Sequence, residues 1–314
     1  MKNKVALYGA GNVGATTAHW LAQMEIADLV LFDIFGQIGA GKALDLYESG
    51  PALGFDGRIT GSNDPAIIEG ADVVVVTAGV PRRKDPETGK FPSRDELVKI
   101  NQEVMEVVAE NIKKYAPDSI VVLVTNPLDA MAHVMLRKTG FEPRRVIGQA
   151  GALDTARYKT FIADELGVSV EDVHGIVLGG HGDTMVPLPR LTSVAGIPVT
   201  ELISQEKLDA IIERTRKGGG EIVGLLGYSG YYAPAAGTAI MVESILKDKK
   251  RVIPSAIYTQ GEYGYHDLFI GLPAVLGRNG VERVIEFELT AEERAMLDHS
   301  AEAVRSVVAV LGYD

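Results

Sequence analysis

The chain has 314 residues, of which 46% are hydrophobic and 23% charged, and it has no cysteine and a formal net charge of −11. This composition is typical of a soluble globular protein, and the length suits one large or two ordinary domains. The lack of cysteine excludes disulfides, thiolate nucleophiles and cysteine metal sites, and the acidic balance argues against a nucleic-acid footprint, which needs clustered Lys and Arg. Because the start does not resemble a signal peptide and no apolar run approaches the roughly 20 residues of a membrane span, we expect a cytoplasmic protein that binds neither nucleic acid nor membranes.

The first predicted element is a strand, Lys4 to Tyr8, that runs directly into the glycine turn GAGNVG and a helix-like segment. A dinucleotide pyrophosphate requires this order, because the helix N-terminus offers unpaired N–H groups and a partial positive charge. Gly9 permits the tight turn, Gly11 lets the backbone approach the phosphates, and Gly14 allows close packing of the helix. The pattern predicts a dinucleotide site, and its weak specificity requires support from the next strand.

That strand, Asp28 to Asp33, ends in an acid close to the expected separation of about 20 residues from the glycines. The carboxylate of Asp33 can accept hydrogen bonds from both hydroxyls of an adenosine ribose, and its charge would repel a 2′-phosphate. This favours NAD over NADP as the cofactor. The alternative is a strand-end aspartate that only caps the next turn.

The alternation of strands and helices then continues. Residues 71–76 form a continuous apolar run, which is typical of a strand buried on both faces of a parallel sheet. A polar segment follows, and Ser93 with Glu96 forms a capping box that starts a helix extending to about residue 115. Arg94 lies in the first turn of this helix, where a cation is unfavourable against the helix dipole. An anionic partner for Arg94 is one interpretation, and a solvated surface loop is the other.

The next buried strand, Ser119 to Thr125, stops at Asn126 and Pro127, because proline cannot continue the ladder and suits the first turn of a helix. Ligands bind at the carboxyl edge of open parallel sheets, so Asn126 lies where a ligand is expected. Asparagine before proline is also a common turn and cap residue, and both interpretations stand at this point.

A later helix containing LDTAR carries Asp154 and Arg157 three residues apart, and therefore on one face. They form either a surface ion pair worth well under about 1 kcal/mol, or one wall of a cleft in which Asp154 meets His181 and Arg157 binds a carboxylate. His181 follows a predicted strand, 173–178, where two glycines break the apolar run. A histidine in such a place is more often structural than catalytic, so its assignment depends on the other two residues.

Gly218, Gly219 and Gly220 lie in the middle of a predicted helix and cost about 1 kcal/mol each relative to alanine, so a bend or the close approach of another chain element must compensate. The other predicted elements of the second half are an antiparallel hairpin over 185–199, the helix over 206–226, a helix over about 230–247, three antiparallel strands within 251–288, and a C-terminal helix capped by Thr290 and Glu293.

Parallel units therefore come first, and antiparallel strands with long helices come second. We expect an α/β protein in which residues 1–149 form an NAD-binding Rossmann domain with a doubly wound parallel sheet. Residues 150–314 are expected to form a mixed α+β domain that binds the substrate and carries the catalytic residues. No internal repeat, low-complexity tract or spacing of metal ligands is found in the sequence.

With GAGNVG, LFDI, VTNPLD, LDTAR and GGHGD in this order, the chain resembles the lactate/malate dehydrogenase family, in particular its lactate-dehydrogenase-like malate dehydrogenases. The likeness runs from the first strand to the C-terminal helix. It implies reversible hydride transfer between malate and NAD, giving oxaloacetate and NADH, by a homo-oligomer that is a dimer or a tetramer.

The resemblance makes His181 the acid/base that exchanges a proton with the substrate hydroxyl, and Asp154 the partner that fixes its tautomer. Arg157 would bind the 1-carboxylate and Asn126 the reacting oxygen, while Arg94 would stabilise negative charge that develops on that oxygen. The cofactor-binding residues that the resemblance implies are Gly9, Gly11, Asn12, Val13, Gly14, Asp33, Asn101, Val124 and Asn126.

Substrate choice is assigned to Arg82. In the family, the position that it matches holds Arg in malate enzymes and usually Gln in lactate enzymes. A buried Arg facing the methyl group of pyruvate would be left unpaired, whereas the distal carboxylate of oxaloacetate satisfies it. The loop between Arg82 and Arg94 is several residues longer than is usual in the family, which leaves Arg83 and Lys84 as alternatives for this role.

Three other functions are weighed against this one. A lactate or broad-specificity 2-hydroxy acid dehydrogenase would differ in its rates on oxaloacetate and pyruvate. A non-catalytic NAD-binding regulator would keep Gly9 to Asp33 but would not need His181, Asp154 and Arg157 together. A hydrolase that uses Asp and His would need a serine or cysteine elbow, which this sequence lacks.

Overall fold

The computed structural model describes residues 3–35, 37–81 and 93–313. Its strands are β1 (Lys4–Tyr8), β2 (Asp28–Phe32), β3 (Ile59–Ser62), β4 (Val73–Val76), β5 (Ile120–Leu123), β6 (Val146–Gly148), β7 (Val173–His174), β8 (Val177–Leu178), β9 (Val186–Pro187), β10 (Ser193–Val194), β11 (Ile197–Pro198), β12 (Arg251–Gln260), β13 (His266–Gly277) and β14 (Gly280–Val284). Its α-helices are α1 (Asn12–Met24), α2 (Ile38–Glu48), α3 (Gly50–Leu53), α4 (Arg94–Tyr115), α5 (Leu128–Thr139), α6 (Ala150–Leu166), α7 (Val199–Leu202), α8 (Gln205–Leu226), α9 (Tyr232–Leu246) and α10 (Ala291–Ala309).

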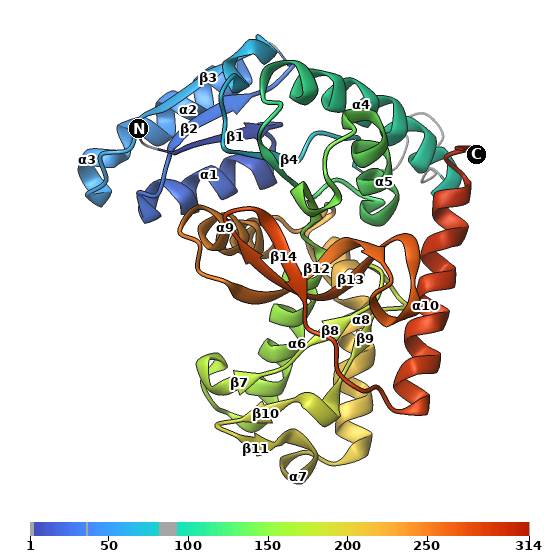
Figure 1. The fold of residues 1–314 in the computed structure, drawn as a ribbon. Coiled ribbons are helices and arrows are strands. Elements are labelled where there is room, and N and C mark those ends of the chain that lie inside the picture. Colours follow the sequence, from blue (N-terminus) through green and yellow to red (C-terminus); the bar gives the residue numbers. More distant parts are fainter. Residues whose placement is uncertain (1–2, 36, 82–92, 314) are drawn as a thin grey trace.

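One large sheet runs through the molecule in the order β14-β13-β12-β6-β5-β4-β1-β2-β3 (Figure 1). The strands from β6 to β3 are parallel, and the strand order reverses at β1, between β4 and β2. β12, β13 and β14 continue the same sheet in antiparallel fashion. The predicted Rossmann-type parallel sheet and the later antiparallel strands are confirmed. The sequence did not predict that they join in one sheet, through the pairing of β6 with β12.

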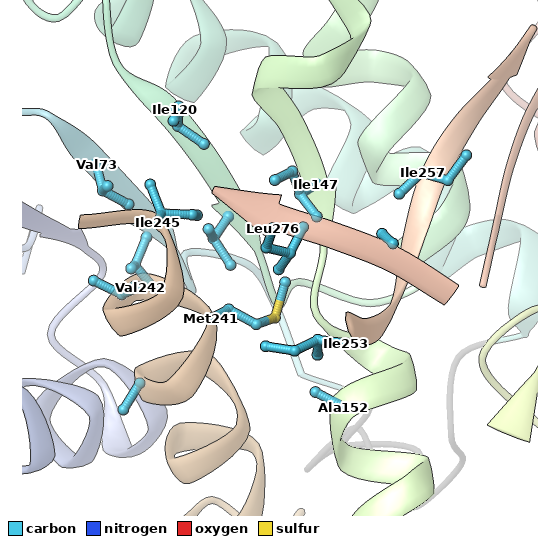
Figure 2. Packing of buried hydrophobic residues seen from close by; sticks show 14 of the residues in the cluster. Val73, Ile120, Ile147, Ala152, Met241, Val242, Ile245, Ile253, Ile257 and Leu276 are labelled. Atoms are coloured by element: carbon cyan, nitrogen blue, oxygen red, sulfur yellow. The ribbon is translucent and has the colours of Figure 1, made fainter. Parts of the chain in front are cut away.

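The parallel strands are buried on both faces, as the unbroken apolar run of β4 indicated. Alternate valines of β4 point into two separate hydrophobic clusters. In the first cluster, Met241, Val242 and Ile245 of α9 pack near Val73 and Ile120 of the parallel strands (Figure 2). Helices α4 and α5 cover the opposite face. A helix from the second half of the chain therefore completes the core of the first half.

Local sequence signals explain where several helices begin and end. Both predicted capping boxes are present: Ser93 with Glu96 starts α4, and Thr290 with Glu293 starts α10. Gly140 ends α5 in the left-handed region, where glycine carries no steric penalty. Across residues 3–35, 37–81 and 93–313, no helix combines the length and apolar character that crossing a membrane demands.

The predicted strand over 173–178 is wrong as a single element. The chain forms two short strands, of which β7 pairs with β10 and β8 pairs with β9. They are separated at Gly175, where a Cβ would lie 3.2 Å from the Thr192 side chain. The hairpin predicted over 185–199 is narrower than expected, since only β10 and β11 form it. The apolar pattern predicted one strand, but its two ends pair with different strands that lie further along the chain, so it divides into β7 and β8.

Candidate functional site

The glycine turn after β1 forms one wall of a cavity. A Cβ on Gly14 would lie 1.9 Å from the carbonyl oxygen of Gly9, so the packing of α1 on this turn requires glycine at position 14. By contrast, no described atom lies within 4 Å of a Cβ placed on Gly11. Gly11 is also the N-cap of α1 and has no side chain to bond the first N–H groups of the helix. These N–H groups are therefore available to an anion.

The cavity has a volume of about 1860 Å³, and Asn12, Val13 and Asp33 are among its lining residues. It exceeds the roughly 300–1,000 Å³ of ordinary small-molecule pockets, as an extended dinucleotide would require. The carboxylate of Asp33, at the end of β2, accepts the N–H groups of Ala10 at 2.9 Å and Phe35 at 3.0 Å. Asp33 thereby fixes the glycine turn while its carboxylate lies on the cavity wall. The turn at 228–231, which follows α8, also lines the cavity.

Asn101 links the segments around this cavity. It is buried in α4, and its Oδ1 accepts the N–H of Val80 at 2.7 Å. Its Nδ2 donates to the carbonyl oxygens of Val80, at 3.1 Å, and Asn126, at 2.7 Å. Asn126 is exposed just after β5, and Val124 is half-buried there with its N–H bonded to the carbonyl of Val76. The amide of Asn101 is thus used within the protein, whereas the side chain of Asn126 has no hydrogen bond to another residue in ranges 3–35, 37–81 and 93–313.

The backbone of Gly179 and Gly180, just before His181, is fixed by hydrogen bonds to two other elements. The backbone of Gly179 exchanges two hydrogen bonds, of 2.9 and 3.0 Å, with Gly271 of β13. The N–H of Gly180 donates to Ser300 Oγ of α10 at 2.9 Å. Gly179 adopts a positive φ of 91°, and the absence of side chains at both glycines lets β13 and α10 approach the backbone, which holds His181 in place.

His181, Asp154 and Arg157 meet in the second half of the chain. His181 Nδ1 lies 2.9 Å from Asp154 Oδ2, and Arg157 Nη1 lies 3.6 Å from Asp154 Oδ1. The second distance is an ionic contact that is too long for a hydrogen bond. The Asp154 side chain is 3% exposed and that of Arg157 11%, so this is not a surface ion pair. Asp154 does meet His181, as the cleft interpretation expected, while the binding of a carboxylate by Arg157 stays a prediction.

Burial alone would lower the pKa of His181, because it disfavours the charged imidazolium. The charge and the hydrogen bond of Asp154, with a smaller contribution from Asp129, outweigh burial and raise the pKa of His181 above its ordinary value. The nearby Arg157 opposes this rise. The surroundings of His181 therefore favour its protonated form.

Sequence reasoning missed Asp129, although it lies within the motif VTNPLD. Its Oδ2 accepts the backbone N–H of His181 at 3.1 Å, and its buried Oδ1 has no hydrogen-bond partner among the described residues. Burial raises the pKa of Asp129 to about 6, against the opposing influence of His181. The motif contains this aspartate, but only the fold shows that α5 places its carboxylate next to the backbone N–H of His181.

Two predicted substrate residues are not placed. Arg82 and its alternatives, Arg83 and Lys84, lie outside the described residues, and Arg94 is the first residue of α4 with its side chain outside them. In the ranges that the structure describes, no group of three or more His, Asp or Glu is arranged to hold a metal ion.

Comparison with known proteins extends over the whole chain. A model of the lactate/malate dehydrogenase NAD binding domain matches residues 3–148, and a model of the lactate/malate dehydrogenase alpha/beta C-terminal domain matches residues 151–310. A malate dehydrogenase of Thermomicrobium roseum is 55% identical to the chain over 308 residues, which cover 98% of each protein.

Two solved structures are also closely similar. A malate dehydrogenase from Salinibacter ruber matches with a TM-score of 0.93 and 49% identity, covering 98% of this chain and 97% of that one. A lactate dehydrogenase from Cryptosporidium parvum, complexed with lactic acid and nicotinamide adenine dinucleotide, matches with a TM-score of 0.94 and 38% identity, covering 100% and 99%.

Proposed function

This chain belongs to the lactate/malate dehydrogenase family, and from that premise we propose that it catalyses the reversible, NAD-dependent oxidation of malate to oxaloacetate. Curated relatives with 52–55% identity over nearly the whole chain are malate dehydrogenases. The observation that carries the chemistry is the buried pair of His181 and Asp154, 2.9 Å apart and next to Arg157. A carboxylate-oriented histidine beside a cation suits the oxidation of an anionic hydroxy acid.

The chain's own residues bind the substrate and move the proton. NAD, when bound, supplies the hydride acceptor for malate oxidation. Because Nδ1 of His181 is bonded to Asp154, Nε2 is the ring nitrogen that takes the proton from the substrate hydroxyl. Asp154 holds this tautomer and stabilises the imidazolium that forms. Arg157 binds the 1-carboxylate with its planar fork, and Asn126 hydrogen-bonds the reacting oxygen.

The residues around the large cavity fit NAD. The open backbone at Gly11, together with the uncapped start of α1, suits the pyrophosphate. Asp33 suits the adenosine ribose and disfavours a 2′-phosphate. Asn12 and Val13 line the same wall. The observed bonds of Asn101 and Val124 give these two residues an indirect part, in which they hold the segments that end at Val80 and Asn126.

Substrate specificity is the role proposed for Arg82, with Arg94 acting on the charge that develops at the reacting oxygen. The second candidate function, a lactate or broad-specificity 2-hydroxy acid dehydrogenase, is supported by the 38% identical lactate dehydrogenase of Cryptosporidium parvum. The higher identity of the malate dehydrogenase relatives, and the arginine at position 82, favour malate.

We also propose a division into residues 1–149 for the cofactor and 150–314 for the substrate, supported by the two family-model matches. A homo-oligomer, dimer or tetramer, is supported by apolar side chains left exposed on α2 (Leu44, Tyr47) and at the end of α8 (Leu225, Leu226). The proposed cytoplasmic location is compatible with a sequence that contains no cysteine. Light scattering after size exclusion tests the assembly.

The function is tested by following NADH oxidation with oxaloacetate, pyruvate and a longer 2-oxo dicarboxylate in parallel. We expect kcat/KM for oxaloacetate to exceed that for pyruvate by orders of magnitude. His181→Asn should abolish turnover and leave NADH binding intact. A preference for pyruvate would support the second candidate, and retained turnover in His181→Asn would remove that residue from the acid/base role.

A further inference from the structure

Helix α8 contains three consecutive glycines, yet it runs without interruption from Gln205 to Leu226. The three positions differ in their surroundings. No described atom lies within 4 Å of a Cβ placed on Gly219 or Gly220. A Cβ on Gly218 would lie 2.3 Å from Arg157 Cδ and 2.6 Å from Arg157 Nε. Of these three glycines, Gly218 is therefore the one whose missing side chain is filled by another residue.

The same stretch of α8 also binds the head group of that arginine. Arg157 Nη1 donates to the carbonyl oxygen of Thr215, one helical turn before Gly218, at 3.3 Å. On its other side, Nη1 lies 3.6 Å from Asp154 Oδ1. Thr215 and Gly218 are both buried. The guanidinium thus lies between the acid of α6 and the bare backbone of α8.

We propose that Gly218 is a positioning residue for substrate binding, and that the backbone surface of Thr215 and Gly218 forms a seat that orients Arg157 toward the substrate carboxylate. The proposal rests on the proposed function of Arg157 in binding that carboxylate. A two-pronged arginine contact needs the planar fork in a defined orientation. The glycine lets the arginine stem lie flat on the helix, which fixes the plane of the fork.

Replacing Gly218 with alanine forces a movement. Ordinary contact begins at 3.4 Å, so either Arg157 or α8 must shift by about 1 Å, and a misplacement of that size in a binding group can cost about 100-fold in rate. The helix is the less movable partner. Its Leu208 and Ile211 are buried in one cluster with Tyr158 of α6, and Arg216 Nε donates to the carbonyl of Met185 at 3.1 Å. The arginine side chain is expected to give way.

The test compares three variants of one helix in the full-length protein: Gly218→Ala, with Gly219→Ala and Gly220→Ala as matched controls. Steady-state kinetics with oxaloacetate, NADH affinity and the urea midpoint are measured for each. We expect Gly218→Ala to raise the KM for oxaloacetate at least about tenfold and to lower kcat/KM by about 100-fold, with NADH affinity unchanged. Both controls should keep kcat and KM within twofold and have a higher urea midpoint.

A folded Gly218→Ala variant with an unchanged KM would overturn the proposal. A second comparison remains informative if that variant does not fold. Because Arg157→Ala removes the atoms that a Cβ at position 218 meets, Arg157→Ala with Gly218→Ala should match Arg157→Ala alone in kcat/KM and in urea midpoint. A further loss of more than about threefold in the double variant would mean that Gly218 acts elsewhere, and would refute the seat.

Failure of the proposed substrate can be told apart from failure of the seat. If the parent protein reduces pyruvate rather than oxaloacetate, the proposed substrate is wrong. The contrast in KM between Gly218→Ala and Gly219→Ala, measured with pyruvate, then tests the seat in the same way, because both 2-oxo acids carry the 1-carboxylate.

Discussion

Asp154→Asn removes the charge beside His181 while keeping the size of the side chain. At 2.9 Å, two unit charges attract by about 1.4 kcal/mol in bulk water and by roughly 6 kcal/mol at an effective dielectric constant of 20. The Asp154 side chain is 3% exposed and that of His181 22%, so the real attraction falls between these limits. One pKa unit corresponds to about 1.4 kcal/mol. The pKa of His181 should therefore fall by at least about one unit.

The direction in which the pH profile of oxaloacetate reduction shifts follows from the protonation state of His181 that this reaction needs. Oxaloacetate reduction needs protonated His181, so its rate falls as pH rises through the pKa of that residue. In Asp154→Asn, burial and Arg157 lower the pKa of His181 and only the smaller contribution of Asp129 still raises it, so the basic limb of the reduction profile should move to lower pH. The maximal rate should drop by about 10²- to 10⁴-fold, because the tautomer is no longer fixed.

The assay is kcat/KM for oxaloacetate reduction between pH 5 and 9, together with NADH affinity by fluorescence. Asp164→Asn is the matched control, since it makes the same chemical change at an exposed position of the same helix, α6. Its profile should coincide with that of the parent. An unmoved basic limb in Asp154→Asn, with rates within tenfold of the parent, would refute the acid/base assignment.

The remaining predictions concern other parts of the site. Arg82→Gln should collapse the preference for oxaloacetate over pyruvate by orders of magnitude, and an unchanged ratio of kcat/KM values would remove Arg82 from that role. Asp129→Ala leaves the N–H of His181 without its acceptor and should lower the free energy of unfolding in urea by about 1–3 kcal/mol, an effect that Asp129→Asn should largely avoid. Burial raises the pKa of Asp129 to about 6, so the stability contributed by its protonated form is lost as pH rises from about 4 to 6. Asp129→Asn should therefore make the free energy of unfolding less dependent on pH in this range. Gly11→Ala should weaken NADH binding in titrations with little change in the free energy of unfolding. Gly14→Ala should lower the free energy of unfolding, because its Cβ would lie 1.9 Å from the carbonyl oxygen of Gly9. Equal free energies of unfolding for the two variants would contradict this prediction.

The sequence predicted the elements whose signals are local. The strand before the glycine turn, the capping boxes of α4 and α10, and the buried valines of β4 follow from residues within a few positions of one another. Asp154 and Arg157 share a helix face, so their spacing alone placed them together. The family motifs then supplied His181 as their partner.

The parts that escaped prediction depend on contacts between distant segments. The break at Gly175 comes from separate pairing partners, β10 and β9, for β7 and β8. Asp129 gains its place under His181 only because α5 and the loop after β8 meet, 52 positions apart in sequence. The sequence indicated that glycine at position 218 destabilises the helix, but it did not indicate that the side chain of Arg157 occupies the space beside this glycine.

The continuous sheet also limits how the chain could be divided. β6 forms a parallel ladder with β5 on one side and pairs with β12 through Gly148 and Ala256 on the other. The apolar face over β4 and β5 is closed by α9, which belongs to the second family-model match (Figure 2). A fragment that stopped near residue 149 would expose both a strand edge and this face to water. The two halves should therefore melt in one cooperative transition, and a hybrid that exchanges one half between relatives would have to carry α9 and β12 along with the strands they cover.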